Sequence, residues 1–272
     1  MSLETPTRVL VVVKATPQPS RQYGDTVCVA GIDIDAEVPL WLRLYPVPFR
    51  YLEGDRQFKK YDIISVRTRG AGSDKRPESR KIEATSIRTE THVSGWKNRA
   101  ARLELLRDPT MCQLVAQAKA DINAQSLAAI QPARVDGIEF SAHAGWTPEQ
   151  LARFDEYKNQ GDLFRETPPR LLDPPRLMVQ LSYHCETEDC KGHTQRIIDW
   201  ELTALQLRYR GQSDSELKAA ITNNFLAIPF GPERAPKIFV GNQENITCRA
   251  AFTVLGLYYP KRADLPQAET LF

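Results

Sequence analysis

Two cysteines and a histidine lie close together near residue 190. Cys185, Cys190 and His193 fall within nine residues, in a chain of 272 residues that contains only 5 cysteines. Thiolate and imidazole groups are ligands that zinc prefers, and closely spaced ligands lose little chain entropy when they bind one ion. The spacing Cys-x4-Cys-x2-His therefore predicts three ligands of a zinc site.

A tetrahedral site needs a fourth ligand, and the candidates are His184, Cys248, Asp199 and a water molecule. His184 adjoins Cys185, and neighbouring residues of a strand point to opposite faces. Cys248 lies near a predicted pair of strands that can pack beside the cluster. We therefore expect Cys248 to complete a closed Cys3His structural site, whereas an open fourth position would indicate a catalytic zinc.

An acidic pair, Asp199 and Glu201, follows the cluster and supplies an alternative interpretation. Carboxylates beside an open zinc are typical of metal-dependent hydrolases, and a nuclease is the form that we weigh. Residues two apart on a helix diverge by about 200°, so both acids are not expected to bind one metal. We favour a non-enzymatic protein. A nuclease with these two catalytic candidates is the alternative, and a protein-binding scaffold is a second one.

Basic and aromatic residues gather in the first hundred residues. This part has 17 Lys and Arg against 12 Asp and Glu, although the net charge of the whole chain is only +2. Guanidinium groups bind phosphate while aromatic rings stack on bases, which predicts contact with DNA or RNA. The candidate contacts are Arg43, Arg50, Arg67, Arg69, Lys75, Arg76, Arg80 and Lys81. A solvated hairpin gives the same pattern, so that reading stays open.

Short strands separated by Pro, Gly and Asp are predicted in the same region. They cover residues 9–13, 27–34, 40–45, 61–69 and 81–88. Strands of this length and spacing are typical of a small barrel or sandwich. We therefore expect residues 1–95 to form a β-barrel-like domain.

Helical spacing begins at about residue 96, and a mixture of helices and strands follows. Helices are expected from residue 96, over 108–130, 147–158, 198–209 and 213–228, and strands over 135–140, 177–183, 237–241 and 251–257. The predicted fold class is α+β. Residues 96–272 form a second domain, in which the zinc cluster lies between a strand and a helix, as in a zinc knuckle.

Two short strings resemble the peptide with which bacterial proteins bind the DNA sliding clamp. In that binding mode Leu and Phe enter a hydrophobic pocket while Gln binds at a second subsite. The resemblance implies a tether to a sliding clamp, in DNA repair or in defence against foreign DNA. The residues concerned are Gln160, Leu163 and Phe164 in one string and Gln267, Leu271 and Phe272 in the other.

The predicted strands also resemble PUA-like barrels, which read RNA or modified DNA bases. Three further strings resemble a widespread set of uncharacterised bacterial proteins, and this second resemblance spans most of the chain. The strings are Arg43-Leu44-Tyr45-Pro46, Cys185-x4-Cys190-x2-His193 and Asp199-Trp200-Glu201. No activity is attached to that set, so it implies no function.

Composition and short motifs restrict the classes of protein to which this sequence can belong. An odd number of cysteines in a long chain argues against a secreted disulfide framework. No secretory signal pattern begins the sequence, and no apolar run approaches the ~20 residues that span a bilayer. No phosphate-binding loop of the nucleotide hydrolases is present. We expect a cytoplasmic nucleic-acid-binding protein with a structural zinc site and no membrane partner.

Overall fold

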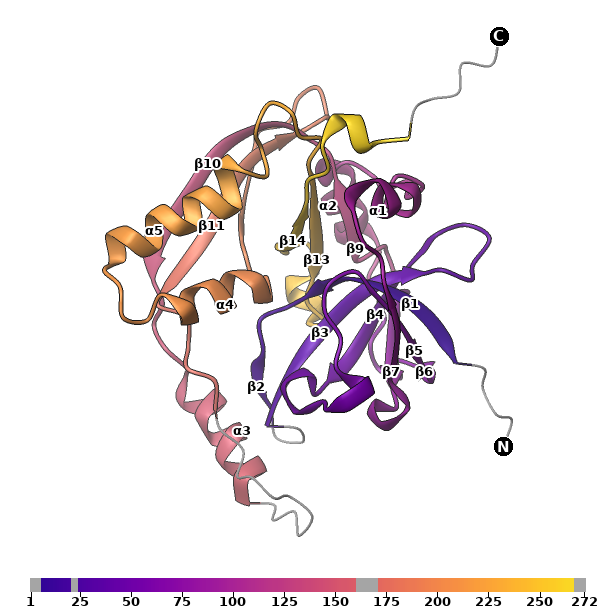
Figure 1. The fold of residues 1–272 in the computed structure, drawn as a ribbon, viewed down its shortest axis with the longest axis vertical. Helices are drawn as coiled ribbons and strands as arrows, with labels where there is room; N and C mark the ends of the chain where they lie inside the picture. The colour runs from indigo at the N-terminus through magenta and orange to yellow at the C-terminus, as the bar shows by residue number, and fades with distance from the viewer. Residues whose placement is uncertain (1–5, 21–23, 160–170, 267–272) are drawn as a thin grey trace.

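Strands in the first ninety-two residues form one curled sheet, a half barrel seen at the lower right of Figure 1. The computed structural model describes residues 6–20, 24–159 and 171–266. Within these ranges the sheet has eight strands in the order β6-β7-β4-β3-β1-β5-β8, with β2 paired to β3. Their bounds are Thr7–Lys14 (β1), Gln18–Ser20 (β2), Gly24–Asp33 (β3), Leu40–Val47 (β4), Asp62–Val66 (β5), Thr68–Gly70 (β6), Ser79–Ile82 (β7) and Arg88–His92 (β8).

The rest of the chain combines helices with two three-stranded sheets, so the fold is mixed α+β as the sequence predicts. One sheet has the order β10-β11-β12 and the other β14-β13-β9. The helices are Trp96–Leu103 (α1), Met111–Ala120 (α2), Pro148–Asn159 (α3), Trp200–Arg208 (α4) and Asp214–Thr222 (α5). The strands are Leu127–Ile130 (β9), Pro132–Ala142 (β10), Leu177–Cys185 (β11), His193–Arg196 (β12), Lys237–Asn242 (β13) and Phe252–Tyr258 (β14).

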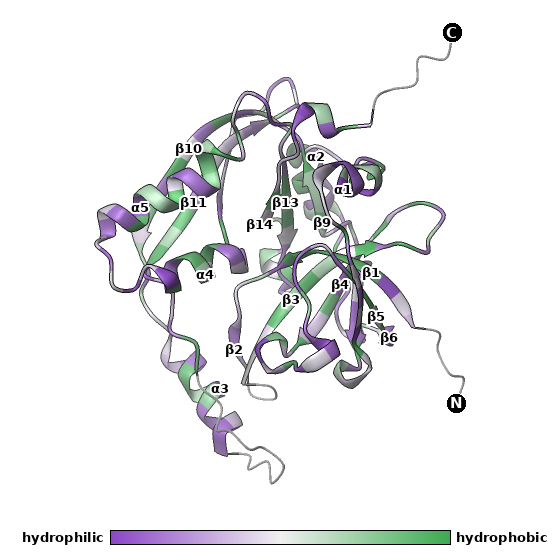
Figure 2. Ribbon diagram, viewed as in Figure 1, coloured by the Kyte–Doolittle hydropathy of each residue, from purple (hydrophilic) through white to green (hydrophobic). Residues whose placement is uncertain are grey.

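Apolar residues follow the strands, whereas α3 and α5 carry polar and apolar residues in alternation (Figure 2). Leu202 and Leu205 of α4 and Leu217 and Ile221 of α5 belong to one buried cluster with residues of β11. The two helices therefore cover one face of the β10–β11 pair. Burying an apolar helix stripe against a sheet is the usual way in which such a layer is stabilised.

We call the part that ends with β8 the first half and the part that begins with α1 the second half. The two halves share a core and main-chain hydrogen bonds. Trp41 of β4 packs edge-on against Phe239 of β13, with ring centroids 5.7 Å apart. The segment after β1 pairs with the start of α4: Ala15 forms a bridge with Asp199, and the Thr16 N–H donates to the Ile198 carbonyl at 2.7 Å. The junction of the halves is thus built from backbone as well as side chains.

One predicted helix is shorter than expected. α2 ends at Ala120 because Asp121 adopts extended backbone, and the apolar run that follows forms β9 beside β13. A run of four apolar residues suits a buried strand as well as a helix, so periodicity cannot separate the two. Asp108 begins the predicted range and suits a helix cap by residue type, but Thr110 caps α2, and Asp108 instead accepts a hydrogen bond from the Trp41 indole at 3.0 Å.

Candidate metal centre and junction cavity

Three cysteines and one histidine converge in the second half of the protein. They are Cys112, Cys185, Cys190 and His193, and their ligand atoms all lie within 4.8 Å of one another. The Sγ atom of Cys185 lies 3.6 Å from those of Cys112 and Cys190. The Nε2 atom of His193 lies 3.3 Å from Sγ of Cys190 and 3.5 Å from Sγ of Cys112. This group can hold a metal ion.

Local structure places each of these ligands. A capping box between Thr110 and Gln113 starts α2 and puts Cys112 in its first turn. Cys185 is the last residue of β11, His193 the first of β12, and the turn between them holds Cys190. The Thr187 hydroxyl joins this turn to α2 through a 2.8 Å hydrogen bond with Thr110. A helix start and a hairpin turn therefore face each other across the group.

The structure corrects the predicted fourth ligand. Cys112, not Cys248, completes the group, and Cys248 ends a separate short turn at Ile246–Cys248. The cluster also lies between two strands rather than between a strand and a helix. Cys112 lies on a predicted apolar helix face, which favours a small core residue, and it is 73 residues from Cys185. Only the capping threonine two residues earlier marks it as the start of a helix.

Electrostatics at the group favours thiolate formation at one cysteine. Burial opposes ionisation of Cys185, but hydrogen bonds with Thr187 outweigh it and lower the pKa of that thiol to about 5. Burial raises the pKa of Cys112 to about 11. Thiolates are the form that binds metal, so an ion would complete the ionisation of the set. Neither Asp199 nor Glu201 belongs to the group.

A cavity of about 560 Å³ lies where the two halves meet. Of the described residues that line it, five are basic and two are acidic. The basic ones are Lys14, Lys59, Lys60, Arg99 and Arg208, and the acidic ones are Asp199 and Glu201. These charged residues come from the end of β1, the segment before β5, helix α1, and helix α4 with the residue before it. We call this the junction cavity.

Asp199 and Lys60 form the buried base of the junction cavity. Oδ1 of Asp199 caps α4 by accepting the Glu201 N–H at 2.9 Å, while Oδ2 is buried and has no hydrogen-bond partner among the described residues. Burial raises the pKa of Asp199 to about 7. Nζ of Lys60 donates to the Leu257 carbonyl at 3.1 Å and pairs with Glu201 at 3.3 Å. Burial disfavours the Lys60 ammonium, but Tyr61, Glu201 and Asp199 outweigh this effect, and the pKa of Lys60 is raised.

Lys14 differs from Lys60 although both line the junction cavity. The Lys14 residue is 8% exposed, and its Nζ lies 4.2 Å from the ring centroid of Phe49. In the ranges that the structure describes, its ammonium makes no hydrogen bond or ion pair. Burial accordingly lowers the pKa of Lys14 to about 8. A buried cation that faces a cavity without a partner is typical of a site whose counter-ion is a ligand.

Aromatic rings line the same cavity. Arg99 stacks on Tyr61, with its guanidinium carbon 3.9 Å from the ring centroid, and on Trp96 at 5.0 Å. Trp96 packs in turn on Tyr259, with centroids 5.0 Å apart. Tyr61 has φ of 71°, a left-handed backbone that a bulky residue seldom adopts. Strain of this kind is held in place by surrounding structure and is frequent at binding sites.

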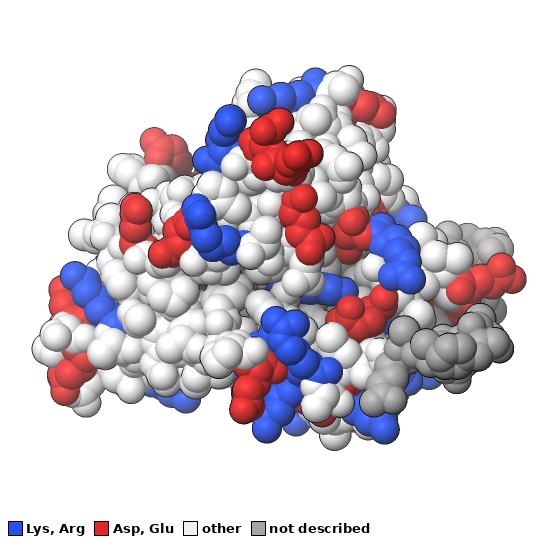
Figure 3. Space-filling model, turned by 90° about the horizontal axis from the view of Figure 1, so that it is seen from above, with Lys and Arg blue, Asp and Glu red and all other residues white. Residues whose placement is uncertain are grey.

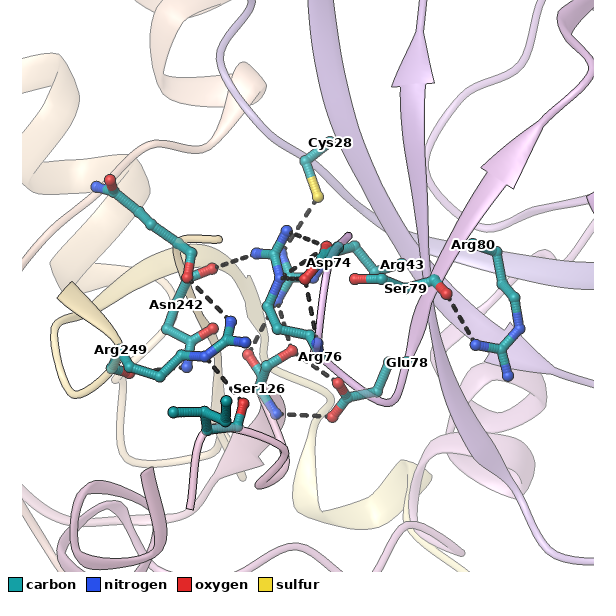
Figure 4. A network of polar contacts seen from close by, with 12 residues as sticks. Cys28, Arg43, Asp74, Arg76, Glu78, Ser79, Arg80, Ser126, Asn242 and Arg249 are labelled. Carbon is teal, nitrogen blue, oxygen red and sulfur yellow. Dashed lines mark hydrogen bonds and ion pairs between the residues drawn. The ribbon is translucent and has the colours of Figure 1, made fainter. Parts of the chain in front are cut away.

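Two of the predicted nucleic-acid contacts are buried. Arg43 and Arg76 are 3% and 8% exposed, and both belong to the polar network of Figure 4. Arg43 donates to the Ser126 carbonyl at 3.0 Å, and Arg76 donates to the Asn242 carbonyl at 2.8 Å and pairs with Asp74. Their guanidinium groups fasten the first half to the second. The predicted role in binding phosphate is therefore wrong for these two residues.

The other predicted contacts are dispersed. Arg67 pairs with Glu83 and Arg80 donates to main-chain carbonyls, while Arg50 is half-buried. Four are exposed: Arg67, Arg69, Lys75 and Lys81. On the face shown in Figure 3, basic and acidic side chains are interspersed and neither sign forms a continuous patch. A single basic surface made by all eight residues is thus not present.

The two sliding-clamp strings lie outside the described residues. Residues 160–164 and 267–272 are not among the residues that the structure describes. Binding to a sliding clamp therefore stays a prediction from the sequence. Within the described ranges, no helix combines the length and the hydrophobicity needed to cross a bilayer.

Comparison with known proteins places the chain in a family. The model described as domain of unknown function DUF8757 matches residues 107–272, and that described as DUF8758 matches residues 5–108. No curated protein matches the chain. One matching solved structure is described as a murine DNA-binding protein bound to double-stranded DNA, with 9% identity, a TM-score of 0.30, and coverage of 97% of this chain and 100% of that chain. A TM-score this low does not establish a shared fold. Since its model covers more than half of the sequence, the chain belongs to the DUF8757 family.

Proposed function

We propose that this protein binds nucleic acid through the junction cavity and that the Cys3His group binds a zinc ion with a structural role. The observation that carries the binding proposal is the lining of the cavity, in which five cations outnumber two carboxylates beside aromatic rings. Cations meet phosphate groups, and the faces of aromatic rings stack on bases of any sequence. Of the eight basic residues that the sequence pattern indicates, Arg43 of β4 and Arg76 of the turn between β6 and β7 are buried.

The dimensions of the cavity suit one nucleotide. Its volume of about 560 Å³ falls within the range of small-ligand sites, which hold one nucleotide-sized group. Lys59 and Arg208, both exposed, supply charge for phosphate, while Trp200 and Tyr259 supply ring surface. A nucleotide of a strand and a free nucleotide share this chemistry. We favour the strand because Arg208 is exposed at the rim, where flanking phosphates would pass.

The structural role of zinc follows from the donor set. Three thiols and one imidazole provide four protein ligands, the number of a closed tetrahedral site. No position is left for a water molecule to act as nucleophile. A nuclease with Asp199 and Glu201 beside an open, catalytic zinc is therefore less well supported than a structural role for the ion.

Binding is tested by titrating fluorescent oligonucleotides of DNA and RNA at several salt concentrations. We expect the logarithm of affinity to fall linearly with the logarithm of salt concentration. Arg208→Gln should weaken binding about threefold to tenfold and make the salt slope shallower by about one. Arg210→Gln is the matched control, because Arg210 lies two residues on and pairs with Asp173. Its affinity should remain that of the unaltered protein.

Competition separates the two sources of the nucleotide. An unlabelled strand should displace the probe, whereas a nucleoside monophosphate should displace it only at much higher concentration. Displacement by the monophosphate at equal concentration would instead indicate a free-nucleotide receptor. Absence of binding at low salt, or equal loss in both arginine variants, would overturn the proposal.

A further inference from the structure

The junction cavity contains two buried lysines in opposite electrostatic settings. Lys60 is fixed as an ammonium by the Leu257 carbonyl at 3.1 Å and by Glu201 at 3.3 Å. Lys14 has neither kind of partner among the described residues, yet its side chain lines the same cavity. A pair of like groups pushed toward different protonation states is the pattern by which acid and base roles are divided in active sites.

The position of Lys14 favours the neutral amine. It ends β1 and is 8% exposed, and the Phe49 ring face 4.2 Å from its Nζ is the one polar or ring contact of its ammonium among the described residues. That contact attracts a cation far less than a carboxylate would. Burial is the largest influence on its pKa, which falls to about 8 although Glu201, Asp199 and Asp62 oppose the fall and Lys60 adds to it. A substantial fraction of Lys14 is therefore neutral just above neutral pH, and a neutral amine is a nucleophile toward carbonyl carbon.

We propose that Lys14 forms an imine with an aldehyde-bearing nucleotide, such as the ring-opened sugar of a strand position that has lost its base. This proposal rests on the proposed function, because the strand must first enter the junction cavity. The remaining cations of the cavity bind the flanking phosphates. The aldehyde carbon of the sugar then meets the only lysine amine among the described lining residues that is both buried and unpaired.

The chemistry balances with water as the sole by-product. The nitrogen lone pair of Lys14 attacks the aldehyde carbon, a C–N bond forms, and the carbonyl oxygen takes a proton to become a hydroxyl. The nitrogen loses a proton, the hydroxyl is protonated and leaves as water, and a C=N bond remains. Glu201 is the carboxylate of the cavity that solvent reaches, with a side chain 54% exposed, and we assign it these proton transfers.

Borohydride trapping tests the imine. The protein is incubated with a fluorescent oligonucleotide that carries one abasic site, and sodium borohydride reduces any imine to a stable amine. A covalent adduct should appear on a denaturing gel, and peptide mapping should place it at Lys14. Lys14→Arg keeps the charge and removes the nucleophile, so the adduct should fall about tenfold or more. Lys97→Arg alters an exposed lysine of α1 that does not line the cavity, so the adduct should stay unchanged in that variant.

Binding without chemistry is measured in parallel. An oligonucleotide with a tetrahydrofuran in place of the abasic sugar has no aldehyde, so it reports affinity alone. Its binding should be nearly equal in the unaltered protein and in Lys14→Arg. Binding of this analogue with no adduct, or with an adduct at another lysine, would overturn the imine alone. Failure of the analogue to bind would overturn the proposed function and the imine with it.

Discussion

Replacing Cys190 by serine is expected to release zinc and to unfold much of the second half of the protein. Cys190 links the turn before β12 to the other three donors, so its loss opens the closed site. Structural zinc contributes about 10–16 kcal/mol to the folding of zinc-finger peptides. Loss of one donor should therefore lower the free energy of unfolding by several kcal/mol. Metal analysis by mass spectrometry and thermal unfolding by circular dichroism measure the two effects.

Cys248→Ser is the matched control for the metal site. Cys248 is also a free and partly buried thiol, but it lies in the separate turn at Ile246–Cys248. This variant should retain about one equivalent of zinc and its melting temperature. Less than roughly half an equivalent in the unaltered protein, or equal behaviour of the two variants, would contradict the structural metal centre.

Replacing Lys60 by methionine is expected to destabilise the protein by about 1–2 kcal/mol at pH 8. The variant loses the positive charge that acts most strongly on the buried Asp199 carboxylate, which must then be protonated or remain buried without compensation. Asp199 is 3% exposed and its Oδ2 already lacks a hydrogen-bond partner in the described structure. Adding Asp199→Asn to Lys60→Met removes the orphaned charge and keeps a side chain that can cap α4. The double variant should recover part of the stability in denaturant unfolding.

The effect of Lys60→Met should depend on pH. The folded-state pKa of Asp199, about 7, lies above its unfolded value near 4. Folding therefore gains from protonation of Asp199 below about pH 4, and this contribution is lost as the pH rises through 7. Without Lys60 the charged carboxylate is costlier still, so the variant should be least stable above pH 7. A destabilisation that is equal at pH 5 and pH 8 would contradict this account.

The sequence predicts β1, β3, β4 and β5 because each is a short apolar or alternating run between turn residues. The strand predicted over residues 81–88 is wrong, since a short helical turn at Ala84–Ser86 separates β7 from β8.

The sequence also predicts three of the four metal ligands because Cys185, Cys190 and His193 are local. Cys112 could not be predicted as a metal ligand, because its contact with the other three depends on how α2 packs on the β11–β12 turn. No local spacing in the sequence encodes that packing. The burial of Arg43 and Arg76 could not be predicted for the same reason, since the carbonyl groups that they bind come from the second half of the chain.

The two acidic residues at the start of α4, Asp199 and Glu201, have surroundings that the sequence pattern does not predict. The sequence pattern suggests Asp199 and Glu201 as catalytic acids beside zinc, whereas the structure places both in the junction cavity. Lys60, which pairs with Glu201, lies 141 residues away in the chain. Burial of a charge and the identity of its counter-charge are tertiary properties, so a sequence can mark the acids without showing what they face.

Photo-crosslinking tests the central claim most directly, because it locates the nucleic acid on the protein. An oligonucleotide that carries a halogenated uracil is irradiated with the protein, and the attached peptides are identified by mass spectrometry. Binding in the junction cavity predicts attachment at Trp96, Trp200 or Tyr259, and loss of attachment when excess unlabelled strand is added. Attachment confined to the exposed turn at residues 69–81 would contradict the account.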